Sequence, residues 1–161
     1  MQHSPLDITR HVLGLHGFDY SEIDSHVFIG TNMCCQYGFD RELLSKNVRA
    51  DISLEEERVD APKGVDYFLW LPTVNGQAPS PDKLDLGIQT LGFLIDRHIK
   101  VFIHCRNGHG RAPVLFIAYL VKGGMGLEEA IAHVRQKRPS IHLTEAQMEG
   151  LKRFSAGHQR L

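Results

Sequence analysis

The chain has 161 residues, enough for one domain with a sizeable core, and we expect residues 1–161 to form a single domain. Apolar residues make up 42% of the chain and charged residues 23%, which is ordinary for a globular protein and excludes a disordered or fibrous one. The 18 basic and 19 acidic side chains give a net charge of −1. This balance predicts neither general nucleic-acid binding nor stable association with anionic membranes.

The termini and the cysteines bear on location. Residues 1–10 hold no apolar run of the kind that a secretory signal needs, and the longest apolar run, residues 114–121, is too short to span a membrane. Three cysteines, of which Cys34 and Cys35 are adjacent, do not form a disulfide framework. We therefore expect a cytoplasmic protein with free thiols, in which Cys34 and Cys35 are small buried apolar residues. The alternative is that one of them forms a protective disulfide with Cys105 under oxidation.

Short β-type runs alternate with longer helical patterns, which predicts an α/β domain. In chain order, the pattern predicts a strand at residues 26–29, a helix at about 39–46, and strands at 48–52 and 65–71. A helix follows from residue 80 to about 98, because Ser80, Pro81 and Asp82 combine an N-cap, a first-position proline and a first-turn acid. A further strand is expected at residues 100–103.

The C-terminal third is predicted to be helical. Residues 111–122 are apolar almost all round, as in a central buried helix, and two glycines end that helix. A second helix is expected at residues 127–137, and a third begins at Thr144, where Thr144 and Gln147 have the spacing of a capping box. The elements together predict a mostly parallel central sheet of four to five strands with helices on both faces.

One segment carries the chemistry of the chain. It lies between the apolar strand and the buried helix, and reads His104-Cys105-Arg106-Asn107-Gly108-His109-Gly110-Arg111. A loop from a strand to a helix N-terminus directs backbone N–H groups into one concavity, which suits an anion, and its glycines allow a tight curl. The fork of Arg111 matches two phosphate oxygens, and these surroundings favour Cys105 as a nucleophilic thiolate. The alternative is a buried structural cysteine beside a turn.

This segment resembles the His-Cys-x5-Arg signature of the small dual-specificity phosphatases in the cysteine-dependent protein tyrosine phosphatase superfamily. The resemblance extends from about residue 23 to residue 154 and includes residues 26–30, 51–58, 71–80 and 137–139. It implies that Cys105 forms a phosphocysteine intermediate, that Arg111 clamps the phosphate and that His104 tunes the thiolate. The loop residues Arg106, Asn107, Gly108, His109 and Gly110 would bind the substrate phosphate with Arg111. It implies no cofactor and no metal.

The chain departs from the family pattern at two positions. The family's general-acid aspartate falls at Asn75, which cannot transfer a proton, and the hydroxyl residue after the arginine is replaced by Ala112. Asp82, Asp85 and His109 are the alternative acids. Because aryl leaving groups need an acid less than alkyl ones, we expect turnover of aryl phosphates and a much weaker rate on phosphoserine.

The predicted function is hydrolysis of phosphate monoesters, with phosphorylated proteins as the substrate, tyrosine before serine or threonine. One alternative is a phosphate-binding pseudophosphatase that lacks the acid. Another is a phosphatase of phosphoinositides or other non-protein phosphates, which the basic character of Arg106 and His109 favours. Sulfur transfer or arsenate reduction fits the surrounding segments less well.

Two further patterns have plain structural explanations. The acidic run that includes Asp51, Glu55, Glu56, Glu57 and Asp60 has no histidine at ligand spacing, so we expect a solvated stretch and not a metal site. Gln147 either caps the last helix or orients a hydrolytic water.

Overall fold

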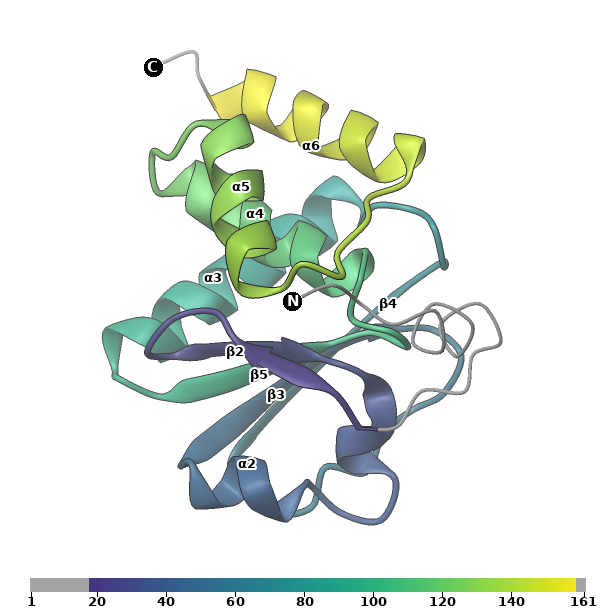
Figure 1. Ribbon diagram of the computed structural model, residues 1–161, viewed down its shortest axis with the longest axis vertical. Helices are drawn as coiled ribbons and strands as arrows, with labels where there is room; N and C mark the ends of the chain where they lie inside the picture. Colours follow the sequence, from purple (N-terminus) through teal and green to yellow (C-terminus); the bar gives the residue numbers. More distant parts are fainter. Residues whose placement is uncertain (1–17, 159–161) are drawn as a thin grey trace.

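The computed structural model describes residues 18–158, and Figure 1 shows a sheet with most of its helices packed on one side. Residues 1–10, where no secretory signal was predicted, lie outside the described residues. The strands are β1 (Tyr20–Glu22), β2 (Val27–Gly30), β3 (Val48–Glu55), β4 (Tyr67–Thr73) and β5 (Lys100–His104). The helices are η1 (Asn32–Cys35), α2 (Arg41–Ser45), α3 (Pro81–Asp96), α4 (Arg111–Lys122), α5 (Leu127–Lys137) and α6 (Glu145–His158).

The five strands form one sheet in the order β1-β2-β5-β3-β4. All neighbouring strands are parallel except β1 and β2, which form an antiparallel pair at the edge. The predicted fold class is therefore confirmed. The sequence analysis missed β1, because its three residues are only partly buried or exposed and carry no apolar run.

Local sequence signals explain most helix boundaries. Helices α4 and α5 have the predicted bounds. At the start of α6, Thr144 Oγ1 accepts a hydrogen bond from Gln147 N at 3.1 Å, and Thr144 N donates to Gln147 Oε1 at 3.0 Å, which is the predicted capping box. Ser80 occupies the N-cap position of α3 as predicted, but its hydroxyl bonds to Asp82 and makes no cap to the helix backbone.

The two faces of the sheet are covered unequally. Helices α3 to α6 cover one face and enclose the larger core cluster (Figure 1). More than half of the residues of α4 belong to this cluster. The opposite face carries α2 and η1, which enclose a smaller cluster around Phe28 and Phe102. The prediction of helices on both faces is thus confirmed, with one thick layer and one thin layer. Within residues 18–158, no helix is both long and apolar enough to cross a membrane.

Candidate active site

The candidate site lies where the chain leaves β5 and enters α4. Cys105 follows β5 directly and is only 3% exposed, and Arg111 is the first residue of α4. A cavity of about 200 Å³ opens beside this loop. Its lining comes from three segments far apart in the sequence: Asn75, Gly76, Cys105, Asn107, His109, Gly110, Arg111, His142, Thr144 and Gln147. Arg106, Gly108 and His104, which were also predicted site residues, do not line the cavity.

The glycines of the loop are required by close packing. Gly108 has a φ of +66°, and a Cβ there would lie 2.5 Å from the backbone oxygen of Gly30. A Cβ on Gly110 would lie 2.6 Å from the side-chain amide of Gln147. Gly110 is also the N-cap of α4 and provides no side-chain cap, so the first N–H groups of the helix stay available to an anion.

A buried arginine holds the loop from behind. Arg138 is 1% exposed, and its Nε donates to the carbonyl oxygen of Gly108 at 2.8 Å. Its Nη2 donates to Asp19 at 2.8 Å and to the Asn107 carbonyl at 3.4 Å. Because these carbonyls point toward Arg138, the loop amides are free to point toward the cavity. This role of Arg138 was not predicted from the sequence, since its partners lie far away in the chain.

Arg111 is oriented by the loop after β3. Its Nη1 and Nη2 donate to the two carboxylate oxygens of Glu57 at 2.8 and 2.9 Å, and Nη1 also donates to the Thr73 carbonyl at 2.9 Å. These contacts use three of the five guanidinium N–H donors. The other two, on Nε and Nη2, share one edge of the fork and have no partner within the described part of the chain. That edge matches two oxygens of a phosphate group.

The residue before Cys105 is the centre of a buried charge cluster. His104 is fully buried, and its Nε2 lies 3.3 Å from Asp51 Oδ1 and 3.2 Å from Asp60 Oδ2. Burial alone lowers the pKa of His104, but the charges and hydrogen bonds of the two acids outweigh it and raise the pKa to about 10. The side chain is thus an imidazolium at neutral pH. A positive charge there favours a thiolate at the neighbouring Cys105.

The prediction of a solvated acidic stretch is wrong for three of its five acids. Asp51, Glu55 and Asp60 are buried, because they surround His104 and the partly exposed Arg58. Glu56 and Glu57 are exposed, although the Glu57 carboxylate is bonded to Arg111. A histidine does lie within reach of the acids, but it is contributed by β5, and this proximity in space is invisible in the spacing along the chain.

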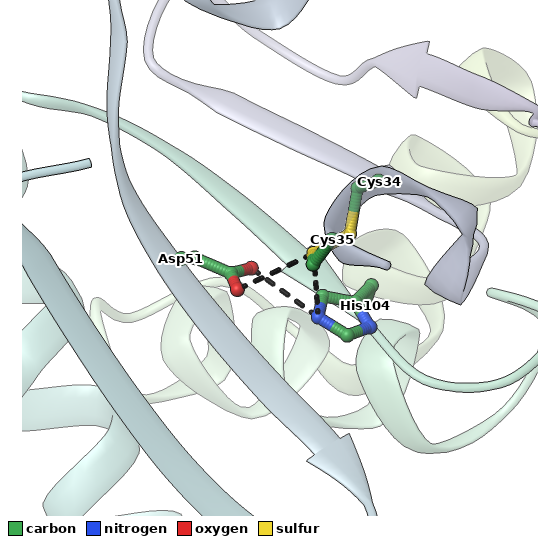
Figure 2. Close-up of side chains that lie close together, drawn as sticks. All are labelled: Cys34, Cys35, Asp51 and His104. Carbon is green, nitrogen blue, oxygen red and sulfur yellow. Dashed lines mark hydrogen bonds and ion pairs between the residues drawn. A yellow bond between two sulfur atoms is a disulfide. The ribbon is translucent and has the colours of Figure 1, made fainter. Parts of the chain in front are cut away.

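The expectation of free thiols is also wrong for two cysteines. Cys34 and Cys35 form a disulfide with each other, and Figure 2 shows it beside Asp51 and His104. Neither residue pairs with Cys105, which is free. The prediction that both are buried holds, since each is 1% exposed.

The structure narrows the choice of proton donors. Asn75 lines the cavity, so the loop predicted to carry the family's acid does reach the site. Asp82 is fully exposed at the start of α3, and Asp85 lines a different cavity. Apart from Cys105 and Arg111, the ionisable residues that line the site within the described chain are His109 and His142.

His142 is a residue that the sequence analysis missed. Its ring lies 5.3 Å from that of His109, centroid to centroid, and its backbone N–H donates to the His109 carbonyl at 3.1 Å. The only sequence signal is its position two residues before the capping box of α6. Gln147 serves as the partner of Thr144 in that box and also donates to the Gln77 carbonyl at 3.3 Å.

Comparisons with known proteins agree with this geometry. Residues 34–156 match the family model described as the dual specificity phosphatase catalytic domain. The crystal structure of PTPMT1 is similar, with a TM-score of 0.73 and 29% identity over 88% of this chain and 96% of that one; PTPMT1 in complex with PI(5)P gives a TM-score of 0.74. A protein tyrosine phosphatase, PRL-1, from Leishmania major is 28% identical over 74% of each chain.

A probable protein tyrosine phosphatase type IVA A from Dictyostelium discoideum is 34% identical over 80 residues. That match spans 48% of its length. The family model covers well over half of this chain, which confirms both the predicted resemblance and the predicted enzyme class. The chain belongs to the small dual-specificity phosphatases of the cysteine-dependent protein tyrosine phosphatase superfamily.

Proposed function

We propose that this chain, residues 1–161 acting as one catalytic domain, hydrolyses phosphate monoesters of phosphorylated proteins through a phosphocysteine on Cys105. The observation that carries the proposal is that a buried thiol and a guanidinium with one edge free of hydrogen bonds within the described residues line the same cavity. Glu57 and Thr73 hold that guanidinium by three hydrogen bonds, so its orientation is set before substrate arrives. No cofactor is needed for this chemistry.

In the first step, the Cys105 thiolate attacks phosphorus, the S–P bond forms and the bond to the leaving oxygen breaks. Arg111 and the N-terminal amides of α4 stabilise the charge on the phosphoryl oxygens. His104 supports the thiolate through its buried positive charge. In the second step, water attacks the phosphocysteine and releases phosphate. Asn107, His109 and Gly110 contact the phosphate from the cavity wall, while Arg106 and Gly108 act through the loop backbone.

Proton transfer to the leaving oxygen is assigned to His142. Asn75 stands at the family's acid position and is unable to carry out this step. An imidazole can both donate and accept a proton near neutral pH, so one side chain can protonate the leaving group and then activate water. His142 is the more exposed of the two cavity imidazoles, whereas His109 is 7% exposed and part of the loop. The leaving group departs toward the cavity mouth, where an exposed side chain can follow it.

Phosphotyrosine is the preferred substrate in this proposal, ahead of phosphoserine and phosphothreonine. Two observations support an aryl leaving group. Some relatives are named as protein tyrosine phosphatases, and Asn75 stands where the family has its acid. A phosphoinositide is the second candidate, and the likeness to PTPMT1 bound to PI(5)P favours it. Nucleic acid and stable membrane association are not part of the proposal, and a cytoplasmic location is proposed from the sequence.

Phosphate release from four substrates tests the function and ranks the substrate classes. The full chain is given p-nitrophenyl phosphate, a phosphotyrosine peptide with its phosphoserine counterpart, and PI(5)P in mixed micelles. We expect kcat/KM to be highest for the aryl phosphates, with Cys105→Ser inactive on all of them. A higher kcat/KM on PI(5)P than on the peptides would transfer the function to the lipid class.

The alternative hypothesis is that the chain is a phosphate-binding domain without turnover. Rapid mixing with p-nitrophenyl phosphate separates the two, because a phosphatase gives a burst of one nitrophenolate per active site and then steady release. Tight vanadate binding with neither phase would identify the binding domain and refute the enzyme. The acid-quenched burst product should carry phosphate on the peptide that contains Cys105.

A further inference from the structure

A second cluster of reactive side chains lies on the face of the sheet opposite α4. Cys34 and Cys35 come from η1, Asp51 comes from β3 and His104 ends β5, and Figure 2 shows the four side chains converging. None of them is more than 1% exposed. Two sulfur atoms, one carboxylate oxygen and one imidazole nitrogen lie within 4.8 Å of one another. The mechanism proposed above uses only the charge of His104 and leaves the two sulfurs without a role.

The spacing of these atoms matches a tetrahedral zinc site. Zinc bonds of about 2.0 to 2.3 Å to oxygen, nitrogen and sulfur place the donor atoms about 3.3 to 3.8 Å apart. Here Cys35 Sγ lies 3.7 Å from His104 Nε2 and 3.6 Å from Asp51 Oδ2. His104 Nε2 also lies 3.3 Å from Asp51 Oδ1, the other oxygen of that buried carboxylate. The fourth donor is Cys34, whose sulfur is now bonded to Cys35.

We propose that reduction of the Cys34–Cys35 disulfide opens a buried site for one Zn²⁺ ion, held by both sulfurs, Asp51 and His104. A dithiol reductant supplies the two electrons and two protons, and is itself oxidised to a disulfide. Zinc then displaces one proton from each thiol and one from the imidazolium. In the oxidised form the sulfurs are bonded to each other and are not thiolates, so the site is closed. Redox state therefore decides whether the metal binds.

The cluster has a route to solvent. A cavity of about 360 Å³ on the same side of the molecule is lined by Cys35 and by residues of the two flanking loops: Gln36, Tyr37, Arg58, Val59 and Ala61. Tyr37 and Val59 are among the most exposed large side chains of the described chain, at 100% and 63%. A small dithiol and a metal ion can approach Cys35 by this path, and neither has to pass through the cavity beside Cys105.

Cobalt binding to the Cys105→Ser form of the full chain tests the site. That substitution removes the catalytic thiol, so any thiolate-to-Co²⁺ charge-transfer band must come from Cys34 or Cys35. Protein reduced with a phosphine, then freed of reductant, should bind one Co²⁺ per chain with that band and with the intense visible bands of tetrahedral coordination. One equivalent of Zn²⁺ should remove both. Protein kept oxidised should show no thiolate band. The absence of the band from reduced protein would refute the site.

Two matched variants locate the metal. Asp51→Asn removes a proposed ligand and should weaken Co²⁺ binding at least about tenfold. Asp60→Asn removes an equal charge that faces the same His104 nitrogen but lies outside the four-donor group, and it should keep the band and most of the affinity. Equal affinities in the two variants would place the metal elsewhere and contradict the proposal. Since the comparison of oxidised with reduced protein needs no change at these two positions, the test does not depend on how well either variant folds. It is also independent of phosphatase turnover, so its failure leaves the proposed function standing.

Discussion

Position 75 offers the sharpest test of how the leaving group receives its proton. Asn75 lies in the turn in which Gln77 N donates to the Val74 carbonyl at 3.0 Å, and Gly76 provides the positive φ of +80° that this turn needs. The turn is tied to α6 by a hydrogen bond of 2.6 Å from Thr144 to the Gly76 carbonyl. Asparagine and aspartate have nearly the same shape. Asn75→Asp therefore places a carboxyl group in the cavity without disturbing the loop.

The magnitude follows from the chemistry of the two leaving groups. A positioned general acid contributes about 10²–10⁴-fold, or about 2.7–5.4 kcal/mol of barrier. If His142 supplies the proton in the natural chain, His142→Gln should lower kcat/KM on a phosphoserine peptide and affect p-nitrophenyl phosphate far less. Adding Asn75→Asp to His142→Gln should then restore the phosphoserine rate by a factor in that range. His133→Gln, a change on α5 outside the cavity, is the matched control.

The four proteins with and without each change form a double-mutant cycle. Two groups that perform the same proton transfer are redundant, so the loss caused by His142→Gln should be small once Asp is present at position 75. The assay is phosphate release from the paired substrates, with Cys105→Ser as the blank. In the His142→Gln background, an equal effect of Asn75→Asp on alkyl and aryl substrates, or no effect on either, would refute the reasoning. So would a loss from His142→Gln that is the same size in both backgrounds.

Three more predictions concern the groups that hold the loop and Arg111. Glu57→Gln leaves the shape of the Arg111 contact but removes its charge, and should lower vanadate affinity by about 1.5–3 kcal/mol, measured by competition. Although burial raises it, the hydrogen bond and charge of Arg111 hold the pKa of Glu57 below its ordinary value. The contribution of Glu57 to stability is therefore complete above about pH 4.3 and is lost as the pH falls through the lowered pKa. The urea midpoint of unfolding should accordingly fall less steeply with decreasing pH in Glu57→Gln than in the unchanged chain. Gly108→Ala should lower the thermal midpoint by several degrees, because its Cβ meets the Gly30 backbone and φ is positive; an unchanged midpoint would show that the loop can relax. Arg138→Lys should reduce kcat/KM while leaving the helical circular dichroism intact, since one ammonium is unable to bond both loop carbonyls.

The features that the sequence predicted well are those set by neighbours along the chain. The bounds of α4 and α5 follow from apolar periodicity and from the glycine and proline residues that end them. The capping box of α6 needs only residues 144–147. The loop of residues 104–111 could be singled out because its strand, loop and helix are consecutive, so that one short motif contains the thiol and the guanidinium.

The features that the sequence did not predict depend on contacts between distant segments. Glu57 and Arg111 are 54 positions apart. Glu56 and Glu57 are adjacent exposed glutamates, and nothing in the acidic run shows that Glu57 is the one that binds Arg111. The burial of Asp51 and Asp60 depends on a histidine supplied by another strand. His142 entered the site through the path of the loop before α6, which periodicity does not describe. In each case the sequence shows the residue type, but it does not show which residue of another segment lies against it.

The arrangement of β3 and β5 explains why the nucleophile and the charge cluster are so close and yet separate. The two strands are parallel neighbours, and Ser53 is in register with His104 at the end of β5. Side chains alternate along a strand, so Phe102 and His104 face η1 and α2, whereas Ile103 and Cys105 belong to the core under α3 to α6. On β3 the same alternation turns Ile52 toward the helices and Asp51 toward His104. The thiol and the imidazolium are therefore on opposite faces of one sheet and are joined by a single peptide bond. We therefore expect a change in charge at His104, whether from loss of a proton or from a bound metal, to act on Cys105 electrostatically across the sheet, without any group entering the cavity beside Cys105.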